Sequence, residues 1–246
     1  SCAGFQLRFI ASGKSSYHLS YWALDNIQVE LKDRDKQTSI FYVSMTGNNS
    51  NDGKSWINAK REVQAAIDAA QPGDEVWVAA GIYYPTSYIA DTTGKQTGKS
   101  IQMKDGVSLF GGFAGTEFMK DKRVKSGSAP WEFQYESVLS GKDIDCDHVI
   151  WSSYEENGFS RYTCLEGFSV TGGSSGYWEA GNYGQGIYAC KNMEVLNCRV
   201  YNNFGVYGGG IYNRGIVRGC LFYQNEGISG AGIFNSGGLI TGCTIQ

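Results

Sequence analysis

The stretch from Gly184 to Gln246 reads GQGIYACKNMEVLNCRVYNNFGVYGGGIYNRGIVRGCLFYQNEGISGAGIFNSGGLITGCTIQ and repeats itself three times. Gly-Ile-Tyr stands at 186–188 and 210–212 and Gly-Ile-Phe at 232–234, at spacings of 24 and 22 residues. Three cysteines keep nearly the same period: Cys198, Cys220 and Cys243. A period of this size, with glycine at the bends and short alternating strands, is typical of a β-solenoid and excludes helical repeats.

Equivalent residues of successive coils stack on one another in such a solenoid, at about 4.8 Å per coil. We therefore expect the three cysteines to form an inward ladder of free, buried thiols, because parallel side chains do not present the torsion of a disulfide. The inward neighbours of this ladder are expected to be Val200, Phe222 and Ile245. Asn213 is expected to lie over Asn235 at a bend, where the side-chain amides can hydrogen-bond along the stack.

Two segments of the repeat resemble the GGxI repeats of polymorphic outer-membrane proteins, namely 208–211 (GGGI) and 230–233 (GAGI). Residues 222–225 (FYQN) between them resemble the FxxN repeat of the same family. The resemblance implies an all-β chain, a right-handed parallel β-helix of the pectate-lyase-like class. It also implies a secreted or surface-displayed bacterial protein, as at the cell outer membrane.

Composition sets limits on the partners. The 246 residues include 34 glycines, and the net charge of −3 provides no basic field for nucleic acid. No apolar run approaches the roughly 20 residues of a membrane helix, so no membrane span is expected. Both ends look cut from a longer chain. Four further cysteines are left open as to bridging: Cys2, Cys146, Cys164 and Cys190.

The N-terminal part predicts a second domain. Residues 1–32 alternate as strands, and 22–29 (WALDNIQV) resemble the closing strand of jelly-roll domains of the MAM and carbohydrate-binding type. We interpret 1–32 as the C-terminal strands of a truncated β-sandwich, followed by a charged linker at 33–39. The parallel β-helix then spans 40–246, with a capping segment at 40–75 and coils at 76–246.

The capping segment combines a strand at 40–44 with an amphipathic helix at 60–70, which Pro72 and Gly73 end. Its motifs, including the NDG of 51–53, resemble the N-terminal segment of bacterial surface β-helix proteins. A helix there would cover the exposed apolar end of the solenoid. Residues 86–100 are polar and predict a projecting loop. Further coil strands are predicted at 107–113, 137–141, 149–150 and 165–173.

The densest acidic feature is Asp143, Asp145 and Asp147. In an extended chain these carboxylates point to one side, where oxygen ligands could hold Ca²⁺. The alternative is a solvated acidic turn. No other cofactor is expected.

Aromatic residues supply the candidate binding site. Tyr188, Tyr212 and Phe234 share one phase of successive coils, and an outward strip of this kind suits the flat face of a sugar ring. The alternative is that the rings stack on each other and shield the sheet. Loops on a rigid scaffold often carry recognition, and one set of loop aromatics is a second candidate: Tyr154, Tyr177, Trp178 and Tyr183.

These patterns favour a non-catalytic, adhesin-like or stalk β-helix from a large secreted or cell-surface bacterial protein, with glycans or other surface proteins as partners. The rival hypothesis is a polysaccharide lyase or glycoside hydrolase, which would need basic residues with Ca²⁺ ligands or two carboxylates about 5–9.5 Å apart. From Gly184 onward the only acids are Glu194 and Glu226, and the histidines His18 and His148 fall in different predicted domains. No residue is therefore assigned a catalytic role.

Overall fold

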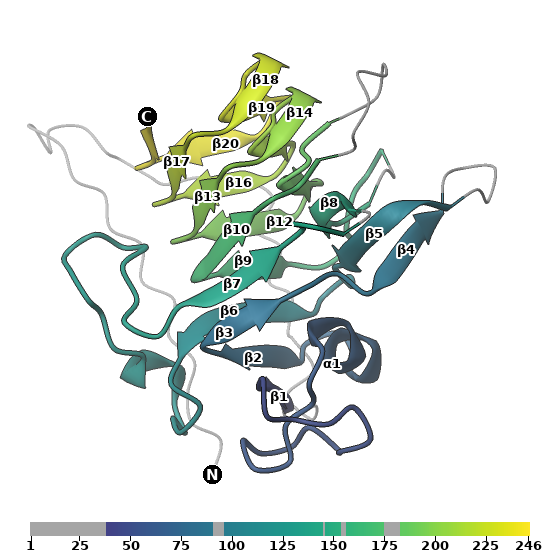
Figure 1. Ribbon diagram of the computed structural model, residues 1–246, viewed down its shortest axis with the longest axis vertical. Helices are drawn as coiled ribbons and strands as arrows, with labels where there is room; N and C mark the ends of the chain where they lie inside the picture. The colour runs from purple at the N-terminus through teal and green to yellow at the C-terminus, as the bar shows by residue number, and fades with distance from the viewer. Residues whose placement is uncertain (1–37, 91–95, 145, 154–155, 175–182) are drawn as a thin grey trace, which may run out of the picture. The chain divides into compact units, whose positions relative to one another are not determined.

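A computed structural model describes residues 38–90, 96–144, 146–153, 156–174 and 183–246. Their strands form three main sheets in which successive coils pair in parallel, so that the fold is the expected all-β, right-handed parallel β-helix. Figure 1 shows the strands of each sheet stacked one above another from the first coil to the last. The predicted sandwich strands of 1–32 and the linker up to residue 37 lie outside the described residues.

Sheet A contains β1 (Ile40–Val43), β2 (Glu75–Ala79), β6 (Ser108–Phe113), β9 (Thr163–Glu166), β12 (Met193–Leu196), β16 (Ile216–Arg218) and β20 (Leu239–Thr241). Sheet B contains β3 (Gly81–Tyr83), β7 (Ser137–Ser140), β10 (Phe168–Thr171), β13 (Arg199–Tyr201), β17 (Leu221–Tyr223) and β21 (Thr244–Ile245). Sheet C contains β4 (Ser87–Ala90), β5 (Gln96–Gln102), β8 (Cys146–Trp151), β11 (Ile187–Ala189), β15 (Ile211–Asn213) and β19 (Ile233–Asn235). A further pair, β14 (Phe204–Tyr207) and β18 (Glu226–Ser229), lies on the connection from sheet B to sheet C.

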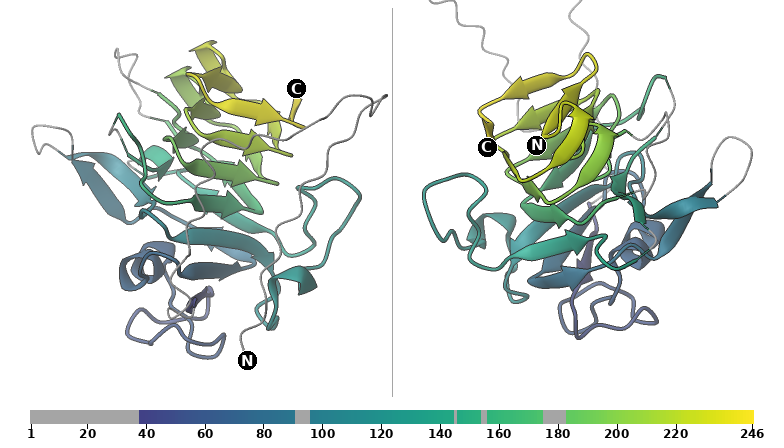
Figure 2. Two further views of the ribbon diagram at one scale, coloured as in Figure 1. Left: turned by 180° about the vertical axis from the view of Figure 1, so that it is seen from behind. Right: turned by 45° about the horizontal axis from the view of Figure 1, so that its top comes forward.

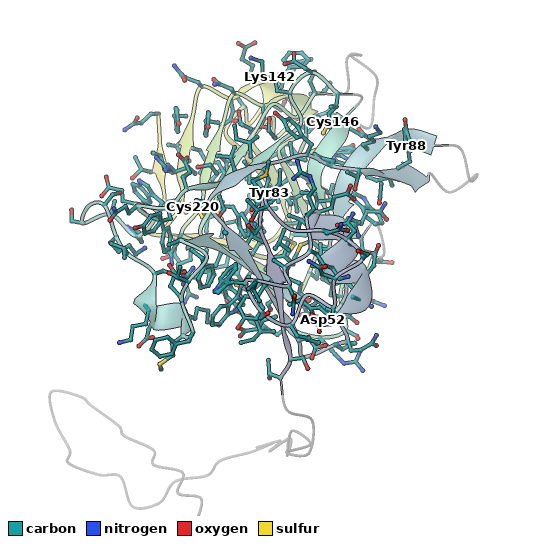
Figure 3. The ribbon with its side chains drawn as sticks, turned by 60° about the horizontal axis from the view of Figure 1, so that its bottom comes forward. Asp52, Tyr83, Tyr88, Lys142, Cys146 and Cys220 are labelled. Atoms are coloured by element: carbon teal, nitrogen blue, oxygen red, sulfur yellow. The ribbon has the colours of Figure 1, made fainter. Side chains whose placement is uncertain are left out.

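The interior is filled by one inward row from each sheet. On sheet B this row includes Leu139, Val170, Val200 and Phe222, all fully buried and aligned in register from coil to coil. Figure 2 shows the same stacking from behind and from the top. Tyr83 and Cys220 lie inside the coil, whereas Tyr88 projects on the β4–β5 hairpin (Figure 3). The predicted inward positions of Val200 and Phe222 are confirmed, while Ile245 on the last strand is 60% exposed.

The first coil is closed by the helix α1 (Val63–Ala69). Its buried residues Val63, Ala66 and Ile67 pack into the same apolar cluster as Phe41 and Val76. This confirms the predicted capping helix, although it is shorter than the 60–70 segment. β1 pairs in parallel with β2, so sheet A begins at Ile40 rather than at the first coil strand expected near Val76.

Two insertions leave the regular coils. The segment at 86–100 leaves the coils, as predicted for a projecting loop, but its described residues form the antiparallel strands β4 and β5, in which Ser87 pairs with Ser100 and Tyr88 with Lys99. The strands were not predicted, because the polar sequence does not report the cross-strand pairing that orders it. The second insertion, residues 114–136, contains the 3₁₀ helix η1 (Lys120–Lys122) and projects beside the coils in Figure 1.

Asparagine and glycine account for the bends. Asn213 donates its side-chain amide to Asn235 at 2.9 Å, as predicted, and Asn203 does the same to Asn225 at 3.0 Å. A Cβ atom at Gly210 would lie 2.4 Å from the carbonyl oxygen of Gly232, so the Gly-Ile-Tyr motif needs glycine for the close approach of neighbouring coils. In the part of the chain described here, no helix is both long and apolar enough to cross a bilayer.

Candidate functional site

The predicted aromatic strip forms a continuous column on the outer face of sheet C. Tyr188 pairs with Tyr212 and Tyr212 with Phe234 in the strand register. Their ring centroids lie 5.1 and 5.6 Å apart, with interplanar angles of 16° and 8°. The predicted alignment of the three residues is therefore confirmed.

A second column, which the repeat analysis did not include, packs beside the first. Tyr183 and Tyr207 stack at 5.0 Å, and each meets a ring of the first column edge to face: Tyr183 on Tyr212 at 4.9 Å and Tyr207 on Phe234 at 5.4 Å. Tyr207 belongs to β14, outside the Gly-Ile-Tyr motif, so the period of that motif could not reveal it. The two columns together form a five-ring cluster, termed here the sheet C aromatic cluster.

The way the rings stack determines which of their atoms the cluster exposes at the surface. Each ring covers a face of the next, so the columns offer mainly ring edges, and Tyr188 is only 6% exposed while the other four rings are half-buried. Burial raises the pKa of the Tyr188 hydroxyl, against a hydrogen bond with Arg214 that lowers it. The stacked rings therefore shield sheet C from solvent. Ring edges and tyrosine hydroxyls remain at the surface.

The loop aromatics Tyr154, Tyr177 and Trp178 lie outside the described residues, so the structure places only Tyr183 of that set. The predicted calcium ligands are also only partly described. Asp143 is exposed with a φ of 61°, Asp147 lies 3.9 Å from Nε2 of His148, and Asp145 is outside the described residues. Within the described ranges, no group of three or more His, Cys, Asp or Glu side chains is arranged to hold a metal ion.

The outer face of sheet B carries a cluster that the sequence did not single out. Arg199 on β13 pairs with Glu136 at 2.9 Å, and the hydroxyl of Ser169 on β10 donates to the same Glu136 oxygen. Tyr201 and Tyr223 stack at 4.8 Å with an interplanar angle of 10°. These five residues, termed here the sheet B polar cluster, come from four successive coils, and the strand register brings them together.

Two carboxylates meet on the outer face of sheet A. Glu166 on β9 and Glu194 on β12 occupy diagonal positions, since Glu194 pairs with Cys164 and Leu196 with Glu166. A pair of carboxylates about 5–9.5 Å apart is what a glycosidase requires. Counting acids only from Gly184 onward missed this pair, because Glu166 belongs to the preceding coil.

Both of these carboxylates are already engaged. Arg123 from the 114–136 insertion donates to Glu166 at 2.8 Å, with side chains 9% and 15% exposed. Glu194 accepts from the Tyr162 hydroxyl at 2.5 Å and lies 3.7 Å from Arg218. Each carboxylate is thus held by partners within the protein, which a substrate would have to displace.

The cysteine ladder differs in one respect from expectation. Cys198 and Cys220 are fully buried, but Cys243 is half-buried on the last coil, so its predicted burial was wrong. All three are free thiols, as are Cys164 and Cys190. A hydrogen bond from the Cys220 thiol lowers the pKa of Cys243 to about 6, whereas burial raises the pKa of Cys220.

The chain matches no protein-family model and no curated protein. Among solved structures it is similar to pectate lyase Pel9A, with 17% sequence identity and a TM-score of 0.46. The similarity covers 85% of this chain and 48% of the lyase chain, so this chain spans about half the length of that protein.

Proposed function

We propose that this chain is a non-catalytic, adhesin-like β-helix from a secreted or cell-surface bacterial protein, and that it binds glycan through the sheet C aromatic cluster. The observation that carries the proposal is the two adjoining aromatic columns, with five rings on the outer face of a rigid coil. A solenoid offers an extended surface with a constant step. A repeating polymer such as a polysaccharide can contact such a surface at several coils.

A glycan-array experiment tests this proposal. The wild-type chain is expected to bind at least one class of glycan, and the double substitution Tyr212→Ala/Phe234→Ala is expected to weaken binding at least tenfold. Both rings are half-buried, so the variant is compared by circular dichroism with Ile82→Ala, which changes an exposed side chain on sheet B. Equal binding by a folded double variant would contradict a role for this cluster.

The alternative function is a glycoside hydrolase that uses Glu166 and Glu194. The diagonal placement of the two carboxylates favours it, and their engagement with Arg123 and Tyr162 opposes it. Release of reducing ends from a polysaccharide by the wild type, lost in both Glu166→Gln and Glu194→Gln, would establish this alternative. Turnover that survives both substitutions would remove it.

Calcium binding at Asp143, Asp145 and Asp147 stays a proposal with its own test. A ligand that binds only the folded protein stabilises it by RT ln(1 + L/Kd), where L is the free ligand concentration, so the stability rises with the logarithm of the free Ca²⁺ concentration once the site is mostly filled. The midpoint of thermal unfolding should then be higher in millimolar Ca²⁺ than in EDTA, and Asp147→Asn should abolish the difference. An identical midpoint in Ca²⁺ and EDTA would contradict it.

A further inference from the structure

The sheet B polar cluster lies on a different face from the aromatic columns. Sheet B and sheet C share no strand. The cluster crosses four successive coils, from Glu136 just before β7 to Ser169 on β10, Arg199 and Tyr201 on β13 and Tyr223 on β17. Figure 1 shows these strands stacked beside the 114–136 insertion. A Cβ atom at Gly219 would lie 3.3 Å from Cγ of Pro130, so the insertion reaches the coil of β16 and β17 and borders this face.

Glu136 and Arg199 retain hydrogen-bonding capacity at the surface. Their side chains are 41% and 28% exposed. A guanidinium nitrogen of Arg199 forms an ion pair with one oxygen of Glu136, and the Ser169 hydroxyl donates a hydrogen bond to the same oxygen. The second carboxylate oxygen and the other guanidinium N–H groups have no protein partner in the described part of the chain. The Glu136 carboxylate can therefore accept hydrogen bonds, and the adjacent Arg199 guanidinium can donate them.

Tyr201 shares strand β13 with Arg199, and Tyr223 on β17 extends the cluster to the following coil. Their stacked rings are half-buried, and burial raises the pKa of both hydroxyls. Both phenols therefore stay protonated at neutral pH and can donate as well as accept. The cluster combines an apolar ring column with donors and acceptors at a spacing set by the coils.

The charges of the cluster balance. Arg199 and Glu136 carry one charge each and the other members none, so the face has no net field that would select an ion. An ion pair this exposed contributes little to folding stability. Paired acceptors and donors beside an aromatic ring match the hydroxyls and the apolar ring face of an uncharged sugar.

We propose that the sheet B polar cluster binds an uncharged, hydroxyl-rich glycan chain that runs across successive coils. Glu136 accepts from sugar hydroxyls, Arg199 donates to sugar oxygens, and Tyr201 on the coil of Arg199 and Tyr223 on the following coil contact the glycan chain. The ligand class rests on the proposed glycan-binding function. The sheet B polar cluster lies on a different face from the sheet C aromatic cluster, so substitutions can test glycan binding at each cluster separately.

Affinity electrophoresis provides the test, with galactomannan and dextran as neutral probes and polygalacturonate as an acidic probe. The wild type is expected to be retarded by a neutral probe, unchanged between 50 and 500 mM NaCl. Arg199→Gln and Tyr201→Ala/Tyr223→Ala are each expected to raise the dissociation constant at least fivefold. Arg199→Gln keeps most of the side-chain volume, so its result stands if the tyrosine variant fails to fold.

The comparison variant is Tyr212→Ala/Phe234→Ala on sheet C. Loss of neutral-probe binding in the sheet C variant, with wild-type binding in both sheet B variants, overturns the inference and leaves the proposed function standing. Loss in the sheet B variants with retention in the sheet C variant supports the inference and contradicts the assignment of binding to the aromatic cluster. Retardation by polygalacturonate alone, or by no probe, overturns the inference.

Discussion

The side-chain nitrogen of Asn213 lies 2.9 Å from Oδ1 of Asn235 on the following coil, while Oδ1 of Asn213 accepts from the backbone N–H of Gly215 at 3.0 Å. Asn213 is fully buried and Asn235 is exposed. The two residues therefore occupy equivalent positions in the repeat, but removing their side chains should change the free energy of unfolding by different amounts.

Asn213→Ala should destabilise the fold by about 1–3 kcal/mol, because it leaves the buried N–H of Gly215 without an acceptor. Asn235→Ala is the matched control and should cost less than about 1 kcal/mol, since water can replace its bonds. Urea unfolding followed by circular dichroism measures both. Equal losses in the two variants would contradict the buried-ladder account.

Cysteine labelling should follow burial along the ladder. Iodoacetamide should modify Cys243 first, with a rate that rises through about pH 6, because its pKa is lowered to about 6 by the Cys220 thiol. Cys198 and Cys220 should stay unlabelled in the native state. Mass spectrometry after a timed pulse reads out each site, and a bridge between any two of the three would refute the stacking geometry.

Cys220→Ser should lower the free energy of unfolding by about 1–3 kcal/mol, since a hydroxyl would replace a thiol in the apolar interior. Cys243→Ser, on the half-buried thiol, is the control and should cost less. Urea titration of both variants gives the comparison. A Cys220→Ser protein as stable as the wild type would show that this position is not in the core.

Stability should fall with acidification through His148. Its ring is buried and lies 3.1 Å from the carbonyl oxygen of Gly184, and burial lowers its pKa below 6.5, against the opposing effect of Asp147. The unfolded chain then binds more protons than the folded chain below pH 6.5, so the free energy of unfolding decreases as the pH falls from 6.5. Well above pH 6.5 the histidine is neutral in both states, and it no longer contributes to the pH dependence.

His148→Gln should remove that part of the pH dependence between pH 6.5 and 5. His18 is present in both proteins, so the difference between their urea midpoints isolates His148. Parallel pH profiles for the two proteins would rule out this histidine as the source.

Arg123 should matter more than other surface arginines. It bonds Glu166 in a mostly buried pair and lies over the rings of Phe113 and Phe133 at 5.4 and 4.8 Å. Arg123→Met leaves Glu166 without its cation and should cost about 3 kcal/mol. Arg161→Met, which breaks the more exposed pair with Asp105, should cost about 0–1 kcal/mol. Similar losses in both would contradict the buried pairing.

The repeat made the coils predictable, because stacking in register depends on residue type at a fixed period. The column of Tyr188, Tyr212 and Phe234 and the pair Asn213–Asn235 follow from that period alone. The capping helix followed from the spacing of Val63, Ala66 and Ile67. These features are local or periodic, and a single sequence reports both.

The sites between coils could not be found in this way. Glu136 reaches Arg199, and Glu166 reaches Arg123, across sequence separations that depend on the lengths of irregular insertions. The β4–β5 hairpin was missed because its polar residues are ordered by pairing, not by an apolar pattern. Register between coils, rather than composition, decides which side chains meet.

The central claim is that the chain binds glycan without cleaving it. One measurement addresses both parts: the protein is incubated with a panel of neutral and acidic polysaccharides, and retention on each polymer is recorded together with released reducing ends and unsaturated products. The account predicts retention by at least one polysaccharide with no product above the level of heat-unfolded protein. Product release lost in Glu166→Gln, or no retention by any polymer, would contradict it.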